Sequence, residues 1–343
     1  LGSPAICFLR TLLRYFEKDA LLLDAAYNVG AAFLSLFNKP ESIAIVRLTT
    51  TNNDYWQQSL QYMIAGNLQA MMDEYVYLLR DSENLKTVSD LNTFITDILS
   101  IRTAPLETEG LKEFKQNLYG DKLRKKNLRA HYAIEFGTKI NTANNSARQI
   151  NIRQAFNSPF RPFVLATTSI GQEGLDFHFY CKKIFHWNLP SNPVDFEQRE
   201  GRINRYKGLV IRQNLAYKYR DIAPNEKGAD IWEKIFKVAE KEKASSSFPC
   251  DLIPFWHTEP VAGLSIQRFV PLYPFSRDRE RYDELIRILS FYRLTFGQPR
   301  QDELIEALHS IGIAEEMKEE LYKLVINLSP VVFMREEVCE EVI

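Results

Sequence analysis

The sequence predicts an α/β protein in which a parallel β-sheet is flanked by two mainly α-helical regions. Strand-like and helix-like segments alternate between residues 126 and 222, and this alternation is typical of a parallel sheet with crossover helices. Residues 1–125 repeat apolar side chains every three or four positions, which is the period of half-buried helices. Residues 223–343 have helical patterns on both sides of a stretch rich in proline and aromatic residues. We therefore expect three regions, with the sheet in the middle one.

The composition is that of a soluble globular protein. Of the 343 residues, 45% are hydrophobic and 25% are charged, which is ordinary for that class. We find no apolar run as long as a membrane span and no signal peptide, so we expect no membrane partner and a cytoplasmic location. The four cysteines lack the CxxC spacing of zinc knuckles, which also argues against a disulfide framework. They are Cys7, Cys181, Cys250 and Cys339.

Charge is distributed unevenly along the chain. The net charge is −1, yet the segment from Leu111 to Arg220 contains 20 Lys and Arg residues against 8 Asp and Glu. A basic middle between acidic ends suggests a site for a polyanion, although a solvated charged surface explains the charge alone equally well. The run Lys122, Arg124, Lys125 and Lys126 leaves the same two alternatives open.

The N-terminal region is predicted to contain four helices and one short strand. Pro40 separates the second helix from the third, and Ile43–Leu48 has the β-branched composition of a strand. We see no catalytic constellation there and expect a helical accessory or inserted region. The predicted helices are Ile6–Tyr15, Leu21–Phe37, Tyr55–Leu79 and Val88–Leu99.

The middle region carries the strands of the predicted sheet. His131–Gly137 fits either a strand or a buried helical turn, and Asn144–Phe156 reads as a helix. The predicted strands are Phe163–Thr167, Ile184–Leu189 and Leu209–Leu215, and Pro193 opens a helix between the last two. Helices are predicted beyond them at Ile231–Lys243, Arg279–Leu294 and Gln301–Leu308.

The segment Gln198–Arg205, with the sequence QREGRINR, is the most informative part of the chain. Arg202 and Arg205 are three residues apart, and residues at this spacing share a face of a helix. Guanidinium groups are planar, permanently charged and able to bind phosphate oxygens in pairs. The alternative is an exposed helix whose arginines form surface ion pairs with Glu197 and Glu200.

A second polar segment, Thr167–Asp176, follows the predicted strand Phe163–Thr167. Ligands of parallel sheets bind beyond the carboxyl ends of the strands. Both this loop and the segment after Leu189 leave from such ends, so we expect them to contribute to one site. For Asp176, a role in a turn or as a helix cap is a competing interpretation.

These segments resemble a known family. Gln198–Arg205 resembles motif VI of superfamily II helicases and translocases, and the segment ATTSIGQEGLDFH at 166–178 resembles motif V. The stretch WNLPSNPVDFEQREGRINR at 187–205 is similar to the Swi/Snf-like branch. The resemblance covers roughly residues 130–220. It implies the second, C-terminal RecA-like lobe of a P-loop NTPase-type motor, whose ATP lies between two lobes.

The resemblance also implies roles for individual residues. Arg202 and Arg205 would be arginine fingers that stabilise charge on the γ-phosphoryl oxygens. The nucleotide would contact Gln198, Asp176, Gly174 and, with a less defined role, Arg199. The nucleic-acid backbone would contact Thr167, Thr168, Ser169, Gly171 and Arg148. In the Swi/Snf-like branch Ile-Gly-Gln commonly follows the last arginine, whereas this chain has Tyr206-Lys207-Gly208.

The implied cofactor is ATP with Mg²⁺, and the implied partners are nucleic acid, DNA rather than RNA, and a first RecA-like lobe. No GxxxxGK[ST] phosphate loop occurs in the 343 residues, so we expect the magnesium ligands in that first lobe and no ATP hydrolysis by this chain alone. The first residue is Leu1, and we expect a fragment of a longer protein. The alternative is a catalytically silent nucleic-acid-binding or scaffolding module.

Three further aromatic or histidine-containing features have mostly structural interpretations. His178 and His186 lack a third metal ligand at a suitable spacing, so we expect packed or hydrogen-bonded side chains and no metal site. Trp187 lies on an apolar strand and is predicted to be in the core. Arg268–Phe275 is either a base-stacking segment or a cover over the core.

Overall fold

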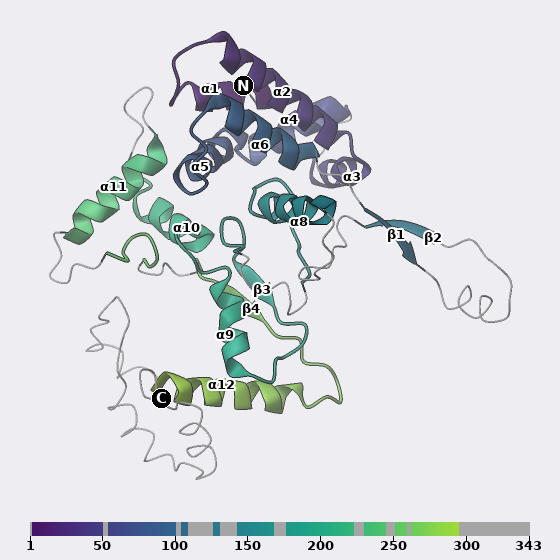
Figure 1. The fold of residues 1–343 in the computed structure, drawn as a ribbon, viewed down its shortest axis with the longest axis vertical. Coiled ribbons are helices and arrows are strands. Elements are labelled where there is room, and N and C mark those ends of the chain that lie inside the picture. Colours follow the sequence, from purple (N-terminus) through teal and green to yellow (C-terminus); the bar gives the residue numbers. More distant parts are fainter. Residues whose placement is uncertain are drawn as a thin grey trace. The chain divides into compact units, whose positions relative to one another are not determined.

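In the computed structural model (Figure 1), the chain forms two compact units. The first comprises Leu1–Tyr180 with Ile222–Lys234, and the second comprises Cys181–Asp221 with Ile235–Ile343. The described residues are 2–50, 54–100, 104–108, 126–130, 143–167, 176–222, 230–244, 251–258, 261 and 263–294. The three-region division expected from the sequence stays a prediction.

The first unit is mainly helical, as the apolar periodicity predicts. Helix α2 packs against α1 and α6, and α1 also packs against α5. Helix α8 has the bounds expected from the sequence to within one residue and contacts α6. The helices of this unit are α1 (Pro4–Leu12), α2 (Ala20–Phe37), α3 (Pro40–Thr49), α4 (Tyr55–Ala65), α5 (Leu68–Asp81), α6 (Val88–Ser100) and α8 (Ala143–Phe156).

Aromatic side chains join the segment after α8 to the helical core. The ring of Phe160 meets Phe33 edge-on with 5.2 Å between ring centroids and meets Tyr75 edge-on at 5.5 Å. Both contacts have the edge-to-face geometry that aromatic pairs prefer. Phe160 is 6% exposed and belongs to the same apolar cluster as Phe8, Val29 and other core residues. The core therefore extends from the N-terminal helices to residue 160.

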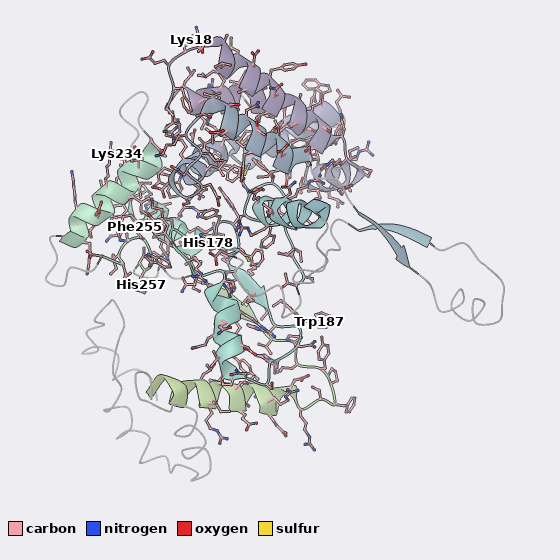
Figure 2. All side chains as sticks on the ribbon, in the orientation of Figure 1. Lys18, His178, Trp187, Lys234, Phe255 and His257 are labelled. Carbon is pink, nitrogen blue, oxygen red and sulfur yellow. The ribbon has the colours of Figure 1, made fainter. Side chains whose placement is uncertain are left out.

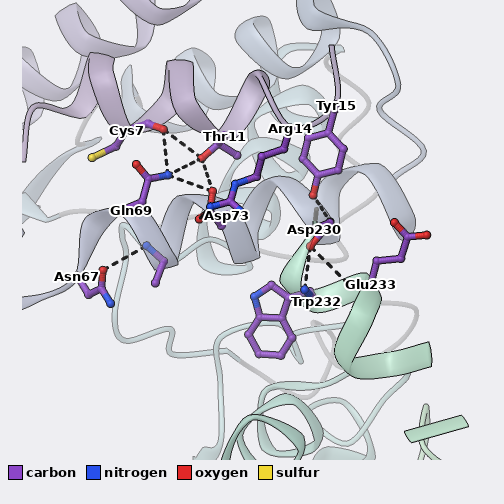
Figure 3. A network of polar contacts seen from close by, with 11 residues as sticks. Cys7, Thr11, Arg14, Tyr15, Asn67, Gln69, Asp73, Asp230, Trp232 and Glu233 are labelled. Atoms are coloured by element: carbon purple, nitrogen blue, oxygen red, sulfur yellow. Dashed lines mark hydrogen bonds and ion pairs between the residues drawn. The ribbon is translucent and has the colours of Figure 1, made fainter. Parts of the chain in front are cut away.

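A buried carboxylate connects α1 to α5 (Figure 3). Asp73 on α5 accepts hydrogen bonds from the Thr11 hydroxyl at 2.7 Å and from Gln69 Nε2 at 3.1 Å. It also forms an ion pair with Arg14, whose Nη2 lies 2.9 Å from Asp73 Oδ2. Asp73 is 7% exposed and Thr11 is fully buried. Buried charge is tolerated where it is paired and hydrogen-bonded in this way.

A second carboxylate in this unit caps α11 (Ile231–Ala244). Asp230 Oδ1 accepts the backbone N–H of Trp232 at 2.8 Å, and its other oxygen accepts the Tyr15 hydroxyl. Burial raises the pKa of Asp230, while the hydrogen bonds from Tyr15 and Trp232 act in the opposite direction. The arrangement satisfies a helix N-terminus and fixes it to the turn after α1 (Figure 3).

The predicted strand at Ile43–Leu48 is wrong, because this segment lies within helix α3. Pro40 occupies the first helical turn, where its fixed φ favours the helix and its missing N–H costs nothing. Val46 is the buried residue of this helix. At the other end, the Thr49 and Thr50 hydroxyls donate to carbonyl groups one turn earlier.

The pattern at Tyr55–Leu79 forms two helices instead of the single one predicted. Helix α4 ends at Ala65, and Asn67 then adopts a left-handed conformation with φ of 48°. The Asn67 side-chain oxygen accepts the N–H of Ala70 at 3.4 Å and caps α5. Asparagine tolerates positive φ and is a good N-cap, so one residue both ends the first helix and starts the second.

The expectation that no apolar segment is as long as a membrane span is wrong, because helix α2 has that length. By length and composition alone, this helix of 18 residues is long and apolar enough to cross a membrane. A mostly buried core helix of a soluble protein and a signal sequence near the N-terminus meet the same criteria, and 33% of α2 is buried. Leu22, Val29 and Phe33 of α2 are buried against the other helices, and Asp24 interrupts the apolar run. We therefore describe α2 as a helix of this bundle.

Two more expectations for the first unit differ from the structure. Within residues 1–125, which were expected to be mainly helical, Ala104–Thr108 forms strand β1, and β1 pairs antiparallel with β2 (Lys126–Ala130). Phe163–Thr167, predicted to be a strand, has no regular secondary structure, and Phe163 and Val164 are 68% and 84% exposed. A strand needs a neighbour to complete its backbone hydrogen bonds, and no neighbour pairs with this segment among the described residues.

The second unit contains a short parallel pairing, but one of its two strands comes from residues 223–343, where no strand was predicted. Strand β3 (Lys183–Phe185) runs parallel to β4 (Gln267–Phe269), with Ile184 opposite Arg268. This strand confirms part of the predicted Ile184–Leu189. Helices α9 (Pro193–Gly201), α10 (Leu209–Lys218) and α12 (Asp278–Leu294) and most of α11 complete the described part of this unit.

The predicted strand Leu209–Leu215 is also wrong, because these residues form most of α10. Ile211 and Leu215 are buried one helical turn apart, and Arg212 and Asn214 are buried beside them. A short β-branched run fits both a strand and a buried helix, and its neighbours decide between them. Helices α8, α9, α11 and α12 confirm the corresponding predictions. His131–Gly137 and Gln301–Leu308 lie outside the described residues.

We predict that Asp73→Ala lowers the free energy of unfolding by about 2–3 kcal/mol, because Thr11, Gln69 and Arg14 lose a shared buried acceptor. Urea unfolding followed by far-ultraviolet circular dichroism measures this change. Asp24→Ala, at an exposed position of α2, is the control and should change stability by less than about 0.5 kcal/mol. Equal effects of the two substitutions would contradict a structural role for the Asp73 network.

Candidate functional site

Helix α9 contains only the first part of the arginine-rich segment Gln198–Arg205. Asn192 caps the helix by accepting the N–H of Val194 at 2.9 Å, and Pro193 occupies the first turn. The helix ends at Gly201, with Arg202 at its C-cap. Arg205 lies beyond this end, in a turn closed by the hydrogen bond from Gly208 N to Arg205 O at 2.9 Å. The prediction that Arg202 and Arg205 share a helical face is therefore wrong.

Glu200 attaches the end of α9 to both strands of the sheet. Arg268 on β4 binds the Glu200 carboxylate with two nitrogens, with Nη2 2.6 Å from Oε2 and Nε donating to Oε1. His186, directly after β3, places its Nε2 3.3 Å from the same Oε1. A bidentate arginine–carboxylate pair is both strong and directional, so the orientation of α9 is defined by it.

Aromatic rings cover this polar contact. The His186 ring stacks on Phe196 with centroids 4.2 Å apart, and the Arg268 guanidinium lies 4.6 Å from the centre of the same ring. Phe196 is fully buried and His186 is 2% exposed. Tyr282 on α12 accepts a hydrogen bond from Arg268 Nη1 at 3.4 Å. One cluster therefore joins α9, both strands and α12.

The contacts in this cluster lower the pKa of Glu200. Burial raises the pKa of this carboxyl, but the hydrogen bonds from His186 and Arg268 outweigh that effect and lower the pKa from 4.5 to about 2. The same hydrogen bond to Glu200 raises the pKa of Arg268. Glu200 is therefore ionised at neutral pH.

The remaining predicted residues of this segment are on or near the surface. Gln198 is exposed, while Arg202 and Arg205 are partly exposed. Arg199 Nη1 donates to the backbone oxygen of Asn188 at 2.9 Å, which attaches α9 to the segment after β3. The structure thus gives Arg199 a structural contact in addition to the nucleotide contact expected from the resemblance.

The motif V segment is described only at its two ends. Thr167 is exposed, and the backbone oxygen of Asp176 accepts Asn157 Nδ2 at 2.7 Å. Thr168, Ser169, Gly171 and Gly174 lie outside the described residues, and so does the side chain of Arg148 on α8. This segment belongs to the first unit and α9 to the second. The expected shared site therefore stays a prediction.

The histidines are packed, as expected, whereas Trp187 is not in the core. His178 lies against Phe179 with 4.3 Å between ring centroids. Trp187, which is labelled in Figure 2, is 67% exposed. Its ring centroid lies 6.1 Å from that of Phe185 and 6.1 Å from that of Tyr273. Strand β3 ends at Phe185, so Trp187 lies beyond the strand on which it was expected. Within the described residues, no three His, Cys, Asp or Glu side chains are grouped as a metal site.

The pairing of Arg268 with Glu200 was not predicted from the sequence. The two residues are 68 positions apart, and the sequence interpretation assigned Arg268–Phe275 to base stacking or to a cover over the core. The structure places Arg268 on β4 and its guanidinium at the end of α9. Only the parallel pairing of β3 with β4 brings the two residues together, and no local sequence signal indicates it.

Comparison with known proteins supports one assignment. Residues 113–207 match the family model described as the helicase conserved C-terminal domain. The match covers less than one third of the chain and includes the whole segment Gln198–Arg205. No curated protein and no solved structure matches the chain.

The match supports a helicase-type C-terminal domain, and with it a RecA-like fold. The short parallel sheet formed by β3 and β4 is consistent with that fold.

We predict that the stability contributed by Glu200 disappears in acid. Its pKa is lower in the folded chain than the ordinary 4.5, so its contribution is complete above that value and is lost as the pH falls toward about 2. At neutral pH, Glu200→Gln should lower the free energy of unfolding by about 1–2 kcal/mol, since partial solvent access screens the interaction. Unfolding at a series of pH values measures the difference, which should shrink between pH 4.5 and 2.

Glu280→Gln is the matched control, because Glu280 is an exposed carboxylate on α12 of the same unit. Its effect on stability should be small at every pH. A constant difference between wild type and Glu200→Gln down to the lowest pH would show that ionisation of Glu200 does not contribute.

Proposed function

We propose that this chain provides the C-terminal lobe of an ATP-dependent nucleic-acid helicase or translocase of superfamily II, in the Swi/Snf-like branch. The observation that carries the proposal is the family match at residues 113–207, which contains Gln198–Arg205. The clustering of Glu200 with Arg268 supports it, because that cluster holds the end of α9 in one orientation. A defined orientation is what a group that acts on a transition state requires.

The residues of this segment fit a nucleotide in charge and position. Arg202 and Arg205 follow the helix end within four positions and are partly exposed. Gln198 is exposed on the last turn of α9 and offers both a donor and an acceptor. ATP with Mg²⁺ would supply the phosphoanhydride bond, and Arg202 and Arg205 would stabilise negative charge on the terminal phosphate.

The proposal assigns nucleic-acid contacts to the segment that precedes Asp176. Thr167, Thr168, Ser169 and Gly171 would bind backbone phosphates through hydroxyl and N–H groups, together with Arg148. The excess of Lys and Arg between Leu111 and Arg220 supports a polyanionic partner, and we propose DNA. A first RecA-like lobe would supply the phosphate loop, and the assembly would work in the cytoplasm without a membrane.

We predict that ATP turnover requires Arg205. In the chain assembled with a first lobe, Arg205→Ala and Arg202→Ala should each lower kcat by roughly 100-fold or more, because the charge on the transferring phosphoryl group loses a stabilising cation. A coupled ATPase assay with and without DNA measures this loss. Arg277→Ala, which removes an exposed arginine of the same unit, should leave kcat within about twofold.

Two outcomes would contradict this proposal. Wild-type turnover in both arginine variants would exclude the finger role. An assembly that binds DNA but never hydrolyses ATP would instead identify the silent nucleic-acid-binding module.

We predict that DNA binding by the chain depends steeply on salt. Contacts to phosphates release counterions, so the association constant should fall by roughly tenfold or more between about 50 and 200 mM salt. Fluorescence anisotropy with labelled duplexes of unrelated sequence measures the constants, which should be similar for all duplexes. Affinity that does not change with salt would contradict backbone recognition.

A further inference from the structure

The turn that follows Arg205 is built around a buried lysine. Lys207 is 3% exposed and has a φ of 49°, in the left-handed region that favours glycine. It is the third residue of the turn closed by the hydrogen bond from Gly208 to Arg205. A long charged side chain is therefore held at a position where glycine or asparagine is usual.

Both backbone polar groups of Lys207 are bound by other segments. Its N–H donates to the backbone oxygen of Phe255 at 2.7 Å. Its backbone oxygen accepts Arg212 Nη1 at 2.7 Å, and Arg212 is fully buried on α10. The turn is thereby fixed on one side by residues 251–258 and on the other by α10.

Three aromatic rings surround the Lys207 ammonium group. Its nitrogen lies 4.6 Å from the ring centre of Phe236, 5.2 Å from Tyr206 and 5.4 Å from Phe255. Phe236 and Phe255 stack on each other with centroids 5.7 Å apart, and Tyr206 stacks on Phe255 at the same distance. Ring faces attract cations, most strongly where water is excluded. Phe255 lies in the second unit, where Figure 2 labels it.

The turn is tight as well as anchored. A side chain on Gly208 would place its Cβ 3.0 Å from Arg205 O, so position 208 has little room for anything larger than glycine. Unfavourable backbone conformations such as that of Lys207 persist where the surroundings determine them, and they are concentrated at functional sites. Ile203, on the other side of Arg205, is 6% exposed. Arg205 is therefore a partly exposed residue between two buried anchors.

We propose that Lys207 is a positioning residue for Arg205. Its side chain, held by Phe236, Tyr206 and Phe255, fixes the turn and with it the direction in which Arg205 leaves the backbone. The catalytic consequence rests on the proposed function of Arg205, whereas the anchoring of the turn does not.

The first experiment measures hydrogen exchange in this chain. Lys207→Met keeps the length of the side chain but removes its charge, so the amides of residues 207 and 208 should exchange about tenfold faster or more. Amides of α9 should be unchanged, which shows that the unit remains folded. Lys207→Arg should restore most of the protection, and Lys241→Met, at an exposed position of α11, should have no effect. Unchanged protection in Lys207→Met would overturn the inference.

The second experiment measures ATP turnover in the chain assembled with a first lobe. Lys207→Met should lower kcat by about 10- to 100-fold and leave KM for ATP within about threefold, because a misdirected group loses transition-state contacts. In an Arg205→Ala background, Lys207→Met should cause no further loss.

The possible failures can be told apart. If Arg205→Ala lowers kcat but Lys207→Met does not, the positioning role is wrong and the proposed function remains. If Arg205→Ala has no effect, the finger role of Arg205 is wrong and the positioning role is overturned with it, even where exchange shows an anchored turn. An additional loss in the double variant would show that Lys207 acts independently of Arg205, which also overturns the inference.

Discussion

The arrangement of the candidate site depends on the bidentate ion pair between the Glu200 carboxylate and Arg268. The carboxylate receives Arg268 from β4 and lies beside His186 at the end of β3, while Phe196 of its own helix covers both partners. A helix packed on a two-stranded sheet by apolar contacts alone could rotate or slide. A bidentate pair permits few orientations, so it determines where α9 ends relative to the strands. The position of the end of α9 in turn determines where the residues that follow it begin.

The first unit uses a carboxylate in a similar way. Asp73 joins α5 to Thr11 of α1 and to Arg14 in the turn after α1, as Glu200 joins α9 to the sheet. In each case a charged group is kept at the edge of an apolar core by partners that satisfy it. The cost of leaving such a group unpaired makes the observed packing strongly preferred over alternatives. Polar contacts of this kind therefore contribute to the specificity of the packing within each unit.

Local sequence patterns predicted the helices well and the strands poorly. Helix α8 has nearly the expected bounds and α9 begins at the expected Pro193, because capping side chains and apolar periodicity are local signals. Four apolar runs were expected to be strands, and only Ile184–Leu189 is confirmed in part, as β3. Ile43–Leu48 and Leu209–Leu215 instead lie within helices, and Phe163–Thr167 forms no regular element. Short β-branched runs fit either structure, and only the neighbours that they meet in the fold select one.

The sequence by itself determined the resemblance of Gln198–Arg205 to helicase motif VI, because a motif is a local order of residue types. The match to a helicase-type C-terminal domain agrees with that identification. The tertiary structure alone decided that α9 ends before Arg205, that Arg268 binds Glu200, and that aromatic rings from distant segments enclose Lys207. These contacts join residues far apart in the chain, so they depend on how the elements pack and on which groups burial forces to find partners.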